Sequence, residues 1–122
     1  MNKTGLGKLG EQQALEFLLA RGYRILERNY RTRYGELDLV AKESGAVCII
    51  EVRSRSTAGF ASAAESVTPA KQKKIIRAAL AYLQERGLLE EKIRFDVVCV
   101  DNSGPKGEVT LIKDAFSQIE DD

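Results

Sequence analysis

The stretch YGELDLVAKESGAVCIIEVRSRS, residues 34–56, contains two apolar runs that are each interrupted by an acidic residue. The runs are rich in Leu, Val and Ile, as strands are, and ESGA between them has the composition of a hairpin turn. A two-residue loop after Glu43 pairs that residue with Ala46. The same register places Asp38 directly opposite Glu51. The sequence therefore predicts a β-hairpin that carries two facing carboxylates.

Two other segments have the apolar periodicity of amphipathic helices. The first is expected from about Leu6 to Arg21, with Gly22 ending it. The second begins at Thr68-Pro69, a capping residue followed by proline, and ends at Arg86-Gly87. The side chains expected to face the core are Leu15, Leu18 and Leu19 in the first helix and Ile76, Ala79, Leu80 and Leu83 in the second.

Five segments are expected to be strands: 23–32, 35–42, 46–55, IRFDVVCVD (93–101) and GEVTLIKD (107–114). The element order is then helix, three strands, helix and two strands. This order predicts an α/β sandwich whose first three strands form an antiparallel meander. At 122 residues the chain is expected to be a single domain, 1–122, with residues 118–122 as a frayed tail.

The composition excludes several classes of protein and of chemistry. No apolar run is long enough to span a bilayer, and the N-terminal stretch has the pattern of an amphipathic helix rather than of a signal peptide, so a cytoplasmic protein is expected. Cys48 and Cys99 lie in strand-like runs and are expected to be buried thiols. The chain has no histidine, which excludes mechanisms that use imidazole as base, nucleophile or metal ligand.

The facing carboxylates of Asp38 and Glu51 need a partner. Their Cβ atoms would lie roughly 5 Å apart, where two negative charges repel unless a proton or a cation lies between them. Mg²⁺ prefers oxygen ligands and takes one or two carboxylates, with water and substrate phosphate filling the other positions. A phosphodiesterase without histidine could use such a site. The alternative is a ladder of exposed salt bridges, because the same register places Glu36 opposite Arg53.

Basic residues gather in two segments although the net charge is only +1. Residues 21–33 hold five Arg against one acid, and residues 53–77 hold six basic residues against one, which predicts a basic face. TPAKQKKIIR places lysines in the first turns of a helix, where the helix dipole disfavours cations, so this segment is either a phosphate-binding site or a solvated surface. The loop after the third strand could close over DNA, with Phe60 as a stacking or a packing residue. The predicted nucleic-acid-binding residues are Arg53, Arg55, Lys71, Gln72, Lys73 and Lys74.

Two further acidic residues occupy core-facing positions. Glu11 precedes Ala14 by three residues and Leu18 by seven, so it lies on the core-facing side of the first helix. A boundary residue favoured by the helix dipole would give the same pattern. Asp96 lies between large apolar residues of the fourth strand and is expected to need a basic partner.

The arrangement of acids resembles the PD-(D/E)XK nuclease superfamily, whose motif is an acid on one strand and Glu-x-Lys on the next. GKLGEQQALEFLLARGYRILERNYRTRYGELDLV, IIEVRSRS, VTPAKQKKIIRAALAYL and RFDVV together resemble the YraN-like bacterial family, whose members are taken to be endonucleases related to archaeal Holliday-junction resolvases. This resemblance covers nearly the whole chain. It implies a restriction-endonuclease-like three-layer fold with a mixed central sheet, Mg²⁺ or Mn²⁺ held by Glu11, Asp38 and Glu51, and branched or damaged DNA as substrate. By analogy with the resolvases it also implies a homodimer.

One position departs from the superfamily motif, because Arg53 stands where the motif has lysine. A guanidinium stays charged, so it can orient water or stabilise charge but cannot take up a proton. Lys71 or Lys73 of the second helix is a candidate replacement. The resemblance therefore allows two functions. One is a metal-dependent endodeoxyribonuclease whose catalytic residues are Glu11, Asp38, Glu51 and Arg53; the other is a nuclease-fold module that binds nucleic acid without cutting it.

Overall fold

The computed structural model describes residues 5–55, 67–102, 104–105 and 107–117. Its elements follow the predicted order, and their boundaries lie within two residues of the predicted ones. The elements are α1 (Gly5–Ala20), β1 (Arg24–Thr32), β2 (Gly35–Glu43), β3 (Ala46–Arg55), α2 (Pro69–Arg86), β4 (Lys92–Asp101) and β5 (Glu108–Phe116). The described residues include no helix that is long and apolar enough to cross a membrane.

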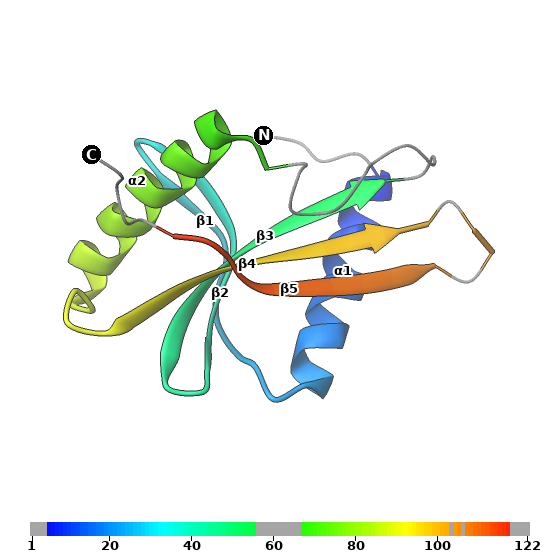
Figure 1. The fold of residues 1–122 in the computed structure, drawn as a ribbon, viewed down its shortest axis with the longest axis horizontal. Coiled ribbons are helices and arrows are strands. Elements are labelled where there is room, and N and C mark those ends of the chain that lie inside the picture. The colour runs from blue at the N-terminus through cyan, green and yellow to red at the C-terminus, as the bar shows by residue number, and fades with distance from the viewer. Residues whose placement is uncertain (1–4, 56–66, 103, 106, 118–122) are drawn as a thin grey trace.

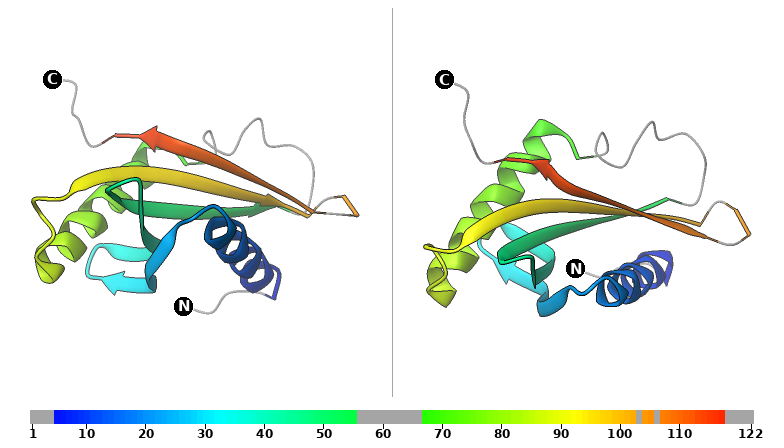
Figure 2. Two further views of the ribbon diagram at one scale, coloured as in Figure 1. Left: turned by 90° about the horizontal axis from the view of Figure 1, so that it is seen from below. Right: turned by 60° about the horizontal axis from the view of Figure 1, so that its bottom comes forward.

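A mixed sheet lies at the centre, with its strands in the order β1-β2-β3-β4-β5. The first three strands are antiparallel neighbours, β3 and β4 pair in parallel, and β4 and β5 pair antiparallel. A parallel pair needs a crossover connection, and α2 lies in it. The two helices cover opposite faces of the sheet, α1 on one and α2 on the other (Figures 1 and 2). The restriction-endonuclease-like three-layer sandwich predicted from the sequence is confirmed.

Each helix packs on the sheet through its own apolar core. Under α1, Ala14 and Leu18 join the side chains of β2, β3 and β4 that point to that face. Under α2, Ala79 and Tyr82 pack against the opposite face of the same strands. Both cysteines, 48 and 99, are buried thiols, as predicted. The sheet is therefore apolar on both sides at its centre, and polar side chains within it need a specific explanation.

Two leucines expected in the core lie at the surface instead. Leu19 is 51% exposed and Leu80 is 44% exposed. Each directly follows a buried residue, Leu18 or Ala79, and consecutive residues of a helix point about 100° apart. The prediction was wrong because it gave more weight to hydrophobicity than to direction around the helix. The buried residues of α2 are Ile75, Ala78, Ala79, Tyr82 and Leu83.

The β2–β3 hairpin has the predicted register. Glu43 faces Ala46 at the turn, and the described ladder continues to the pair of Leu39 and Ile50. Both loop residues, 44 and 45, have positive φ angles of 54° and 77°, as a tight two-residue hairpin loop requires. The next positions along the two strands hold the two acids of the predicted site.

Asp96 is fully buried in β4 and has the basic partner that its position predicts. Arg94 donates from Nε to Asp96 Oδ1 at 2.9 Å and from Nη2 to Oδ2 at 2.8 Å. The hydroxyl of Tyr23 donates to Oδ2 at 3.0 Å, and the backbone N–H of Asp114 donates to Oδ1 at 2.9 Å. Asp96 therefore ties β4 to β5 and to the residue that precedes β1.

Gly10 allows α1 to approach β3 closely. A Cβ atom on Gly10 would lie 2.0 Å from Ser54 Oγ, closer than nonbonded atoms come. One turn further along the helix, the side-chain amides of Gln13 and Asn102 exchange two hydrogen bonds of 3.3 and 3.0 Å. These contacts hold the part of α1 that carries Glu11 against the ends of β3 and β4.

Candidate active site

Asp38 and Glu51 lie directly beyond the last described pair of the β2–β3 ladder. The carboxylate of Asp38 accepts a hydrogen bond of 2.9 Å from the backbone N–H of Val52, so it reaches across to β3. The carboxyl groups of Asp38 and Glu51 also interact with each other, through charge and through a side-chain hydrogen bond. The structure therefore brings together the two acids that the hairpin register predicts to face each other.

The environment of Glu51 favours its protonated form. Burial is the largest cause and the negative charge of Asp38 the next, and together they raise the pKa of Glu51 from 4.5 to about 7. The guanidinium of Arg53 acts in the opposite direction and lowers this pKa. Only 18% of the Glu51 side chain is exposed. The environment of the pair therefore favours a bound proton, and a cation would offset the same negative charge.

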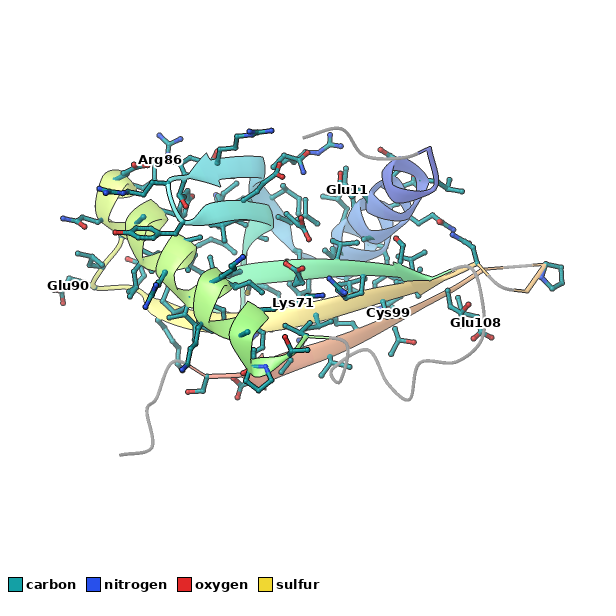
Figure 3. All side chains as sticks on the ribbon, turned by 90° about the horizontal axis from the view of Figure 1, so that it is seen from above. Glu11, Lys71, Arg86, Glu90, Cys99 and Glu108 are labelled. Atoms are coloured by element: carbon teal, nitrogen blue, oxygen red, sulfur yellow. The ribbon has the colours of Figure 1, made fainter. Side chains whose placement is uncertain are left out.

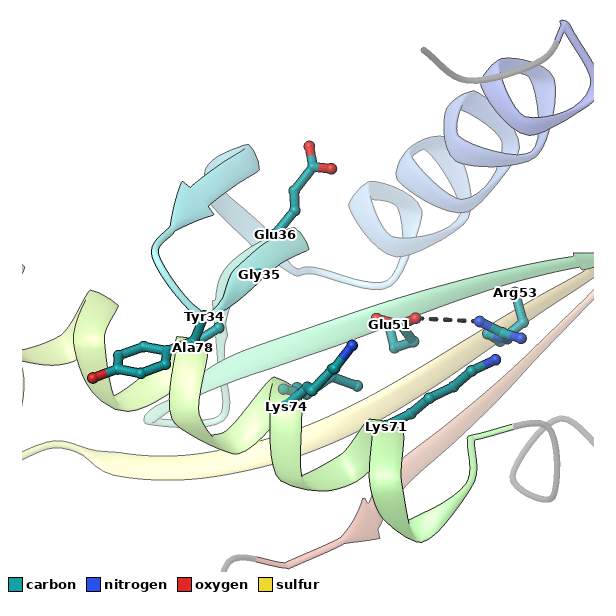
Figure 4. Close-up of a pocket in the computed structure, with 9 residues that line it drawn as sticks. Tyr34, Gly35, Glu36, Glu51, Arg53, Lys71, Lys74 and Ala78 are labelled. Atoms are coloured by element: carbon teal, nitrogen blue, oxygen red, sulfur yellow. Dashed lines mark hydrogen bonds and ion pairs between the residues drawn. The ribbon is translucent and has the colours of Figure 1, made fainter. Parts of the chain in front are cut away.

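Arg53 lies on the same face of β3 as Glu51. Its Nη1 atom donates to Glu51 Oε2 at 3.4 Å, and 25% of its side chain is exposed. The predicted salt-bridge ladder would instead pair Arg53 with Glu36. Figure 4 shows the Glu36 carboxylate pointing away from Arg53. Arg53 is thus a cation held beside the acid pair, where it can contact an anion that enters the site.

A pocket of about 260 Å³ opens beside the acid pair, between the hairpin and α2 (Figure 4). Glu51 and Arg53 lie on its strand side, and Lys71 and Lys74 extend into it from α2. The remaining lining residues are Tyr34, Gly35, Glu36, Ile75 and Ala78. The described first turn of α2 carries no acidic residue that would offset the lysines. The pocket therefore combines Glu51, one member of the acid pair, with three cations.

The N-terminal end of α2 is held in place by its cap. Thr68 Oγ1 accepts from the backbone N–H of Lys71 at 3.3 Å, and Pro69 follows the cap residue. The side-chain amide of Gln72 donates to the carbonyl of Val67 at 3.0 Å. Gln72 thereby braces the start of the helix, although it is predicted to contact nucleic acid. Its contact with nucleic acid stays a prediction.

Glu11 is joined to β1 by a hydrogen bond. Its Oε2 atom accepts from Asn29 Nδ2 at 3.1 Å. In Figure 3, Glu11 is seen on α1 and Lys71 on α2, the helices that flank the sheet. Within the part of the chain that the structure describes, no three Asp, Glu, Cys or His side chains form a group that could hold a metal ion. The participation of Glu11 in a metal site therefore stays a prediction.

Some residues predicted to contact nucleic acid do not line this pocket, and others lie outside the residues that the structure describes. Lys73 is exposed on α2 but does not line the pocket beside the acids. The side chain of Arg55 and the loop 56–66, which contains Phe60, lie outside the described residues. Of the two lysines considered as replacements for the motif lysine, Lys71 is the one that reaches the pocket.

Tyr34 is a pocket residue that was not predicted from the sequence; it lies in the turn between β1 and β2 and is 44% exposed. The signal was available in the sequence, because an aromatic residue stands in a turn between Arg33 and Gly35. The sequence also does not distinguish Lys74, which lines the pocket, from Lys73, which does not. Which of the two lysines reaches the pocket depends on which face of α2 packs toward the hairpin, and this is set by tertiary contacts.

Comparison with known proteins places the chain in a family. Residues 10–100 match the family described as "Uncharacterised protein family UPF0102". A UPF0102 protein of Persephonella marina is 42% identical over 110 residues, which cover 90% of this chain and 91% of the relative. A UPF0102 protein of Desulforapulum autotrophicum is 44% identical over 93% of this chain and 94% of its own length. A third, of Chlorobium phaeobacteroides, is 50% identical over 78% of this chain and 75% of its own length. The chain therefore belongs to the UPF0102 family, which is the YraN family that its motifs resemble.

Proposed function

We propose that this protein is a metal-dependent endonuclease that hydrolyses phosphodiester bonds in DNA. The observation that carries the proposal is the interacting carboxyl pair of Asp38 and Glu51 beside a pocket that also holds Arg53 and two lysines. Carboxylates attract a divalent cation, whereas guanidinium and ammonium groups bind phosphate oxygens. The description of the family names no activity, so the proposal rests on the chemistry of the site.

The residues present fit a Mg²⁺ or Mn²⁺ ion. Asp38 and Glu51 supply two carboxylates, the number that magnesium takes at sites where substrate phosphate and water complete its coordination. A cation between them would offset both causes that raise the pKa of Glu51, its burial first and its repulsion by Asp38 second. When bound, such an ion acts as a Lewis acid on a phosphate oxygen and lowers the pKa of water.

The other pocket residues have distinct roles in this proposal. Lys71 and Lys74 bind and orient the phosphate, because their ammonium groups approach the pocket from the side opposite the acids. Arg53 stays charged and stabilises the negative charge that develops on the phosphate. Since neither the Arg53 guanidinium nor a lysine ammonium can take a proton from water, that step falls to a carboxylate.

The test is cleavage of labelled DNA in the presence of Mn²⁺, with linear duplex, single strand, flap and four-way junction as substrates. Glu51→Gln is the test variant, and Glu90→Gln is the matched control because Glu90 is exposed in the connection between α2 and β4 (Figure 3). We expect cleavage by the wild type and by Glu90→Gln, and none by Glu51→Gln. Equal cleavage by Glu51→Gln would reveal a contaminating nuclease, and no cleavage by any protein would refute the proposal.

A second function, binding of nucleic acid without cleavage, is favoured by the contact between Arg53 and Glu51. This contact places a permanent positive charge 3.4 Å from one of the two proposed metal ligands, where it competes with a divalent ion. This function predicts salt-dependent DNA binding with no metal-dependent cleavage, even after Arg53→Lys. Cleavage by the wild type, or its appearance in Arg53→Lys, would exclude it.

A further inference from the structure

Tyr34 stands between the pocket at the acid pair and a second pocket on α2. The second pocket has a volume of about 340 Å³ and is lined by Tyr34, Arg77, Leu80, Ala81 and Gln84. Tyr34 lines both pockets. Figure 4 shows its ring pointing away from Glu51 and lying alongside Ala78 of α2. A ligand that extends out of the first pocket in this direction would meet the ring of Tyr34.

The turn that carries Tyr34 is held by hydrogen bonds. Thr32 Oγ1 accepts from the backbone N–H of Tyr34 at 3.0 Å and donates to the carbonyl of Gly35 at 2.8 Å. Gly35 has a φ angle of 141°, a backbone conformation that residues other than glycine rarely adopt. The Tyr34 backbone is therefore fixed, so its ring is presented to solvent from a defined position.

The surroundings of the ring combine apolar surface with positive charge. Tyr34 and Leu80 are each 44% exposed and line the same pocket, so apolar surface is open to solvent there. The Arg33 guanidinium lies 5.5 Å from the centre of the Tyr34 ring, and Arg77 lines the second pocket. An apolar ligand alone would not use these cations, and a free anion would not use the ring. A nucleotide uses both, because its base stacks on aromatic rings and its phosphates bind arginine.

We propose that Tyr34 stacks on an unpaired base next to the phosphate that is bound in the acid–lysine pocket, and that the second pocket accepts this nucleotide. The proposal rests on the proposed function, because it uses the first pocket as the phosphate site. It assigns the substrate class: DNA whose strand is unpaired beside the scissile phosphate, as in a flap or a fork. A base within a continuous duplex is stacked on its neighbours and must first leave the stack to reach Tyr34.

The competing structural role of Tyr34 is to cover α2. Two variants separate the roles, because Tyr34→Phe keeps the ring whereas Tyr34→Leu keeps apolar volume and removes the ring. The probes are a forked DNA with 2-aminopurine at its first unpaired position and a fully paired duplex of the same sequence. Affinities are measured by fluorescence anisotropy with Ca²⁺, an ion that also takes oxygen ligands, and intact DNA is confirmed after each titration.

We expect wild type and Tyr34→Phe to prefer the fork over the duplex and to quench the 2-aminopurine fluorescence. Tyr34→Leu should bind the fork about tenfold more weakly, within the range measured for loss of base–aromatic stacking, and the duplex as well as wild type does. Equal binding of the fork by wild type and Tyr34→Leu would overturn the stacking role while leaving the nuclease proposal intact. If wild type binds the fork but does not quench the 2-aminopurine fluorescence, the stacking role is overturned, whether or not Tyr34→Leu folds. If wild type binds neither probe, the phosphate site and the stacking role fail together.

Discussion

Replacing Glu51 with glutamine should stabilise the metal-free protein at pH 8, although Glu51 is proposed to be essential for activity. In the folded protein Glu51 retains its proton up to about pH 7, whereas the unfolded chain releases it near pH 4.5. Between these values the folded state binds more protons than the unfolded state, so wild-type stability falls as the pH rises. Glu51→Gln removes the ionisable group, so the variant does not lose stability in this way as the pH rises.

The magnitude follows from the pKa of Glu51. The pKa of Glu51 rises from 4.5 in the unfolded chain to about 7 in the folded protein. At about 1.4 kcal/mol for each pKa unit, this difference corresponds to a loss of roughly 3 kcal/mol of folding stability when Glu51 is ionised. Because 18% of the side chain is exposed, solvent screens part of this cost, and we expect Glu51→Gln to raise the free energy of unfolding by about 2 kcal/mol at pH 8. Below pH 4.5 the two proteins should be equally stable, since the wild-type group is then protonated in both states.

Urea unfolding followed by circular dichroism, in EDTA at pH 4, 6 and 8, measures this difference. Glu90→Gln is the control and should match wild type at every pH, because Glu90 is exposed. Adding Mg²⁺ at pH 8 should then stabilise wild type but not Glu51→Gln, since a ligand that binds only the folded state adds to its stability. The reasoning is refuted if Glu51→Gln is no more stable than wild type at pH 8, or if an equal gain persists at pH 4.

Three further substitutions test other parts of the structure. Gly10→Ala should lower stability by about 1–3 kcal/mol in thermal unfolding, because its Cβ atom meets Ser54 Oγ, and Ser54→Gly should restore part of the loss; no effect would contradict the close approach of α1 and β3. Lys71→Ala should weaken binding to duplex DNA, because Lys71 lines the pocket proposed to bind phosphate. In anisotropy titrations the slope of log K against log salt concentration should become smaller in magnitude by about 0.9, and an unchanged slope would exclude a phosphate contact. Asp96→Asn should destabilise the fold by about 1.5–3 kcal/mol in urea unfolding, because it weakens two charge-assisted hydrogen bonds while Arg94 keeps its ion pair with Glu43, and a loss below about 1 kcal/mol would show that the Asp96–Arg94 pair is dispensable.

The features that local sequence determines could be predicted from sequence alone. The hairpin register follows from its two-residue turn, and this register is what brings Asp38 and Glu51 together. The ends of α2 follow from Thr68 and Gly87, which cap it as expected. Turn and cap chemistry involve only residues close together in the chain, so such features need no knowledge of the tertiary structure.

Features that depend on how elements pack could not be predicted in the same way. The burial of Leu18 and the exposure of Leu19 depend on the angle at which α1 meets the sheet, and hydrophobicity does not distinguish them. Whether Lys73 or Lys74 reaches the pocket depends on which side of α2 faces the hairpin. The position of Tyr34 between two pockets depends on the same contact. These distinctions require tertiary contacts between residues that are distant in the sequence.

The central claim, that Asp38 and Glu51 together hold a divalent ion, is tested most directly by counting bound Mn²⁺ with electron paramagnetic resonance at pH 8. Wild type and Glu90→Gln should each bind Mn²⁺, and binding should be lost in Asp38→Asn and in Glu51→Gln while all four proteins remain folded. Mn²⁺ binding by Asp38→Asn and Glu51→Gln as strong as that by wild type would contradict the claim, as would the absence of binding by wild type.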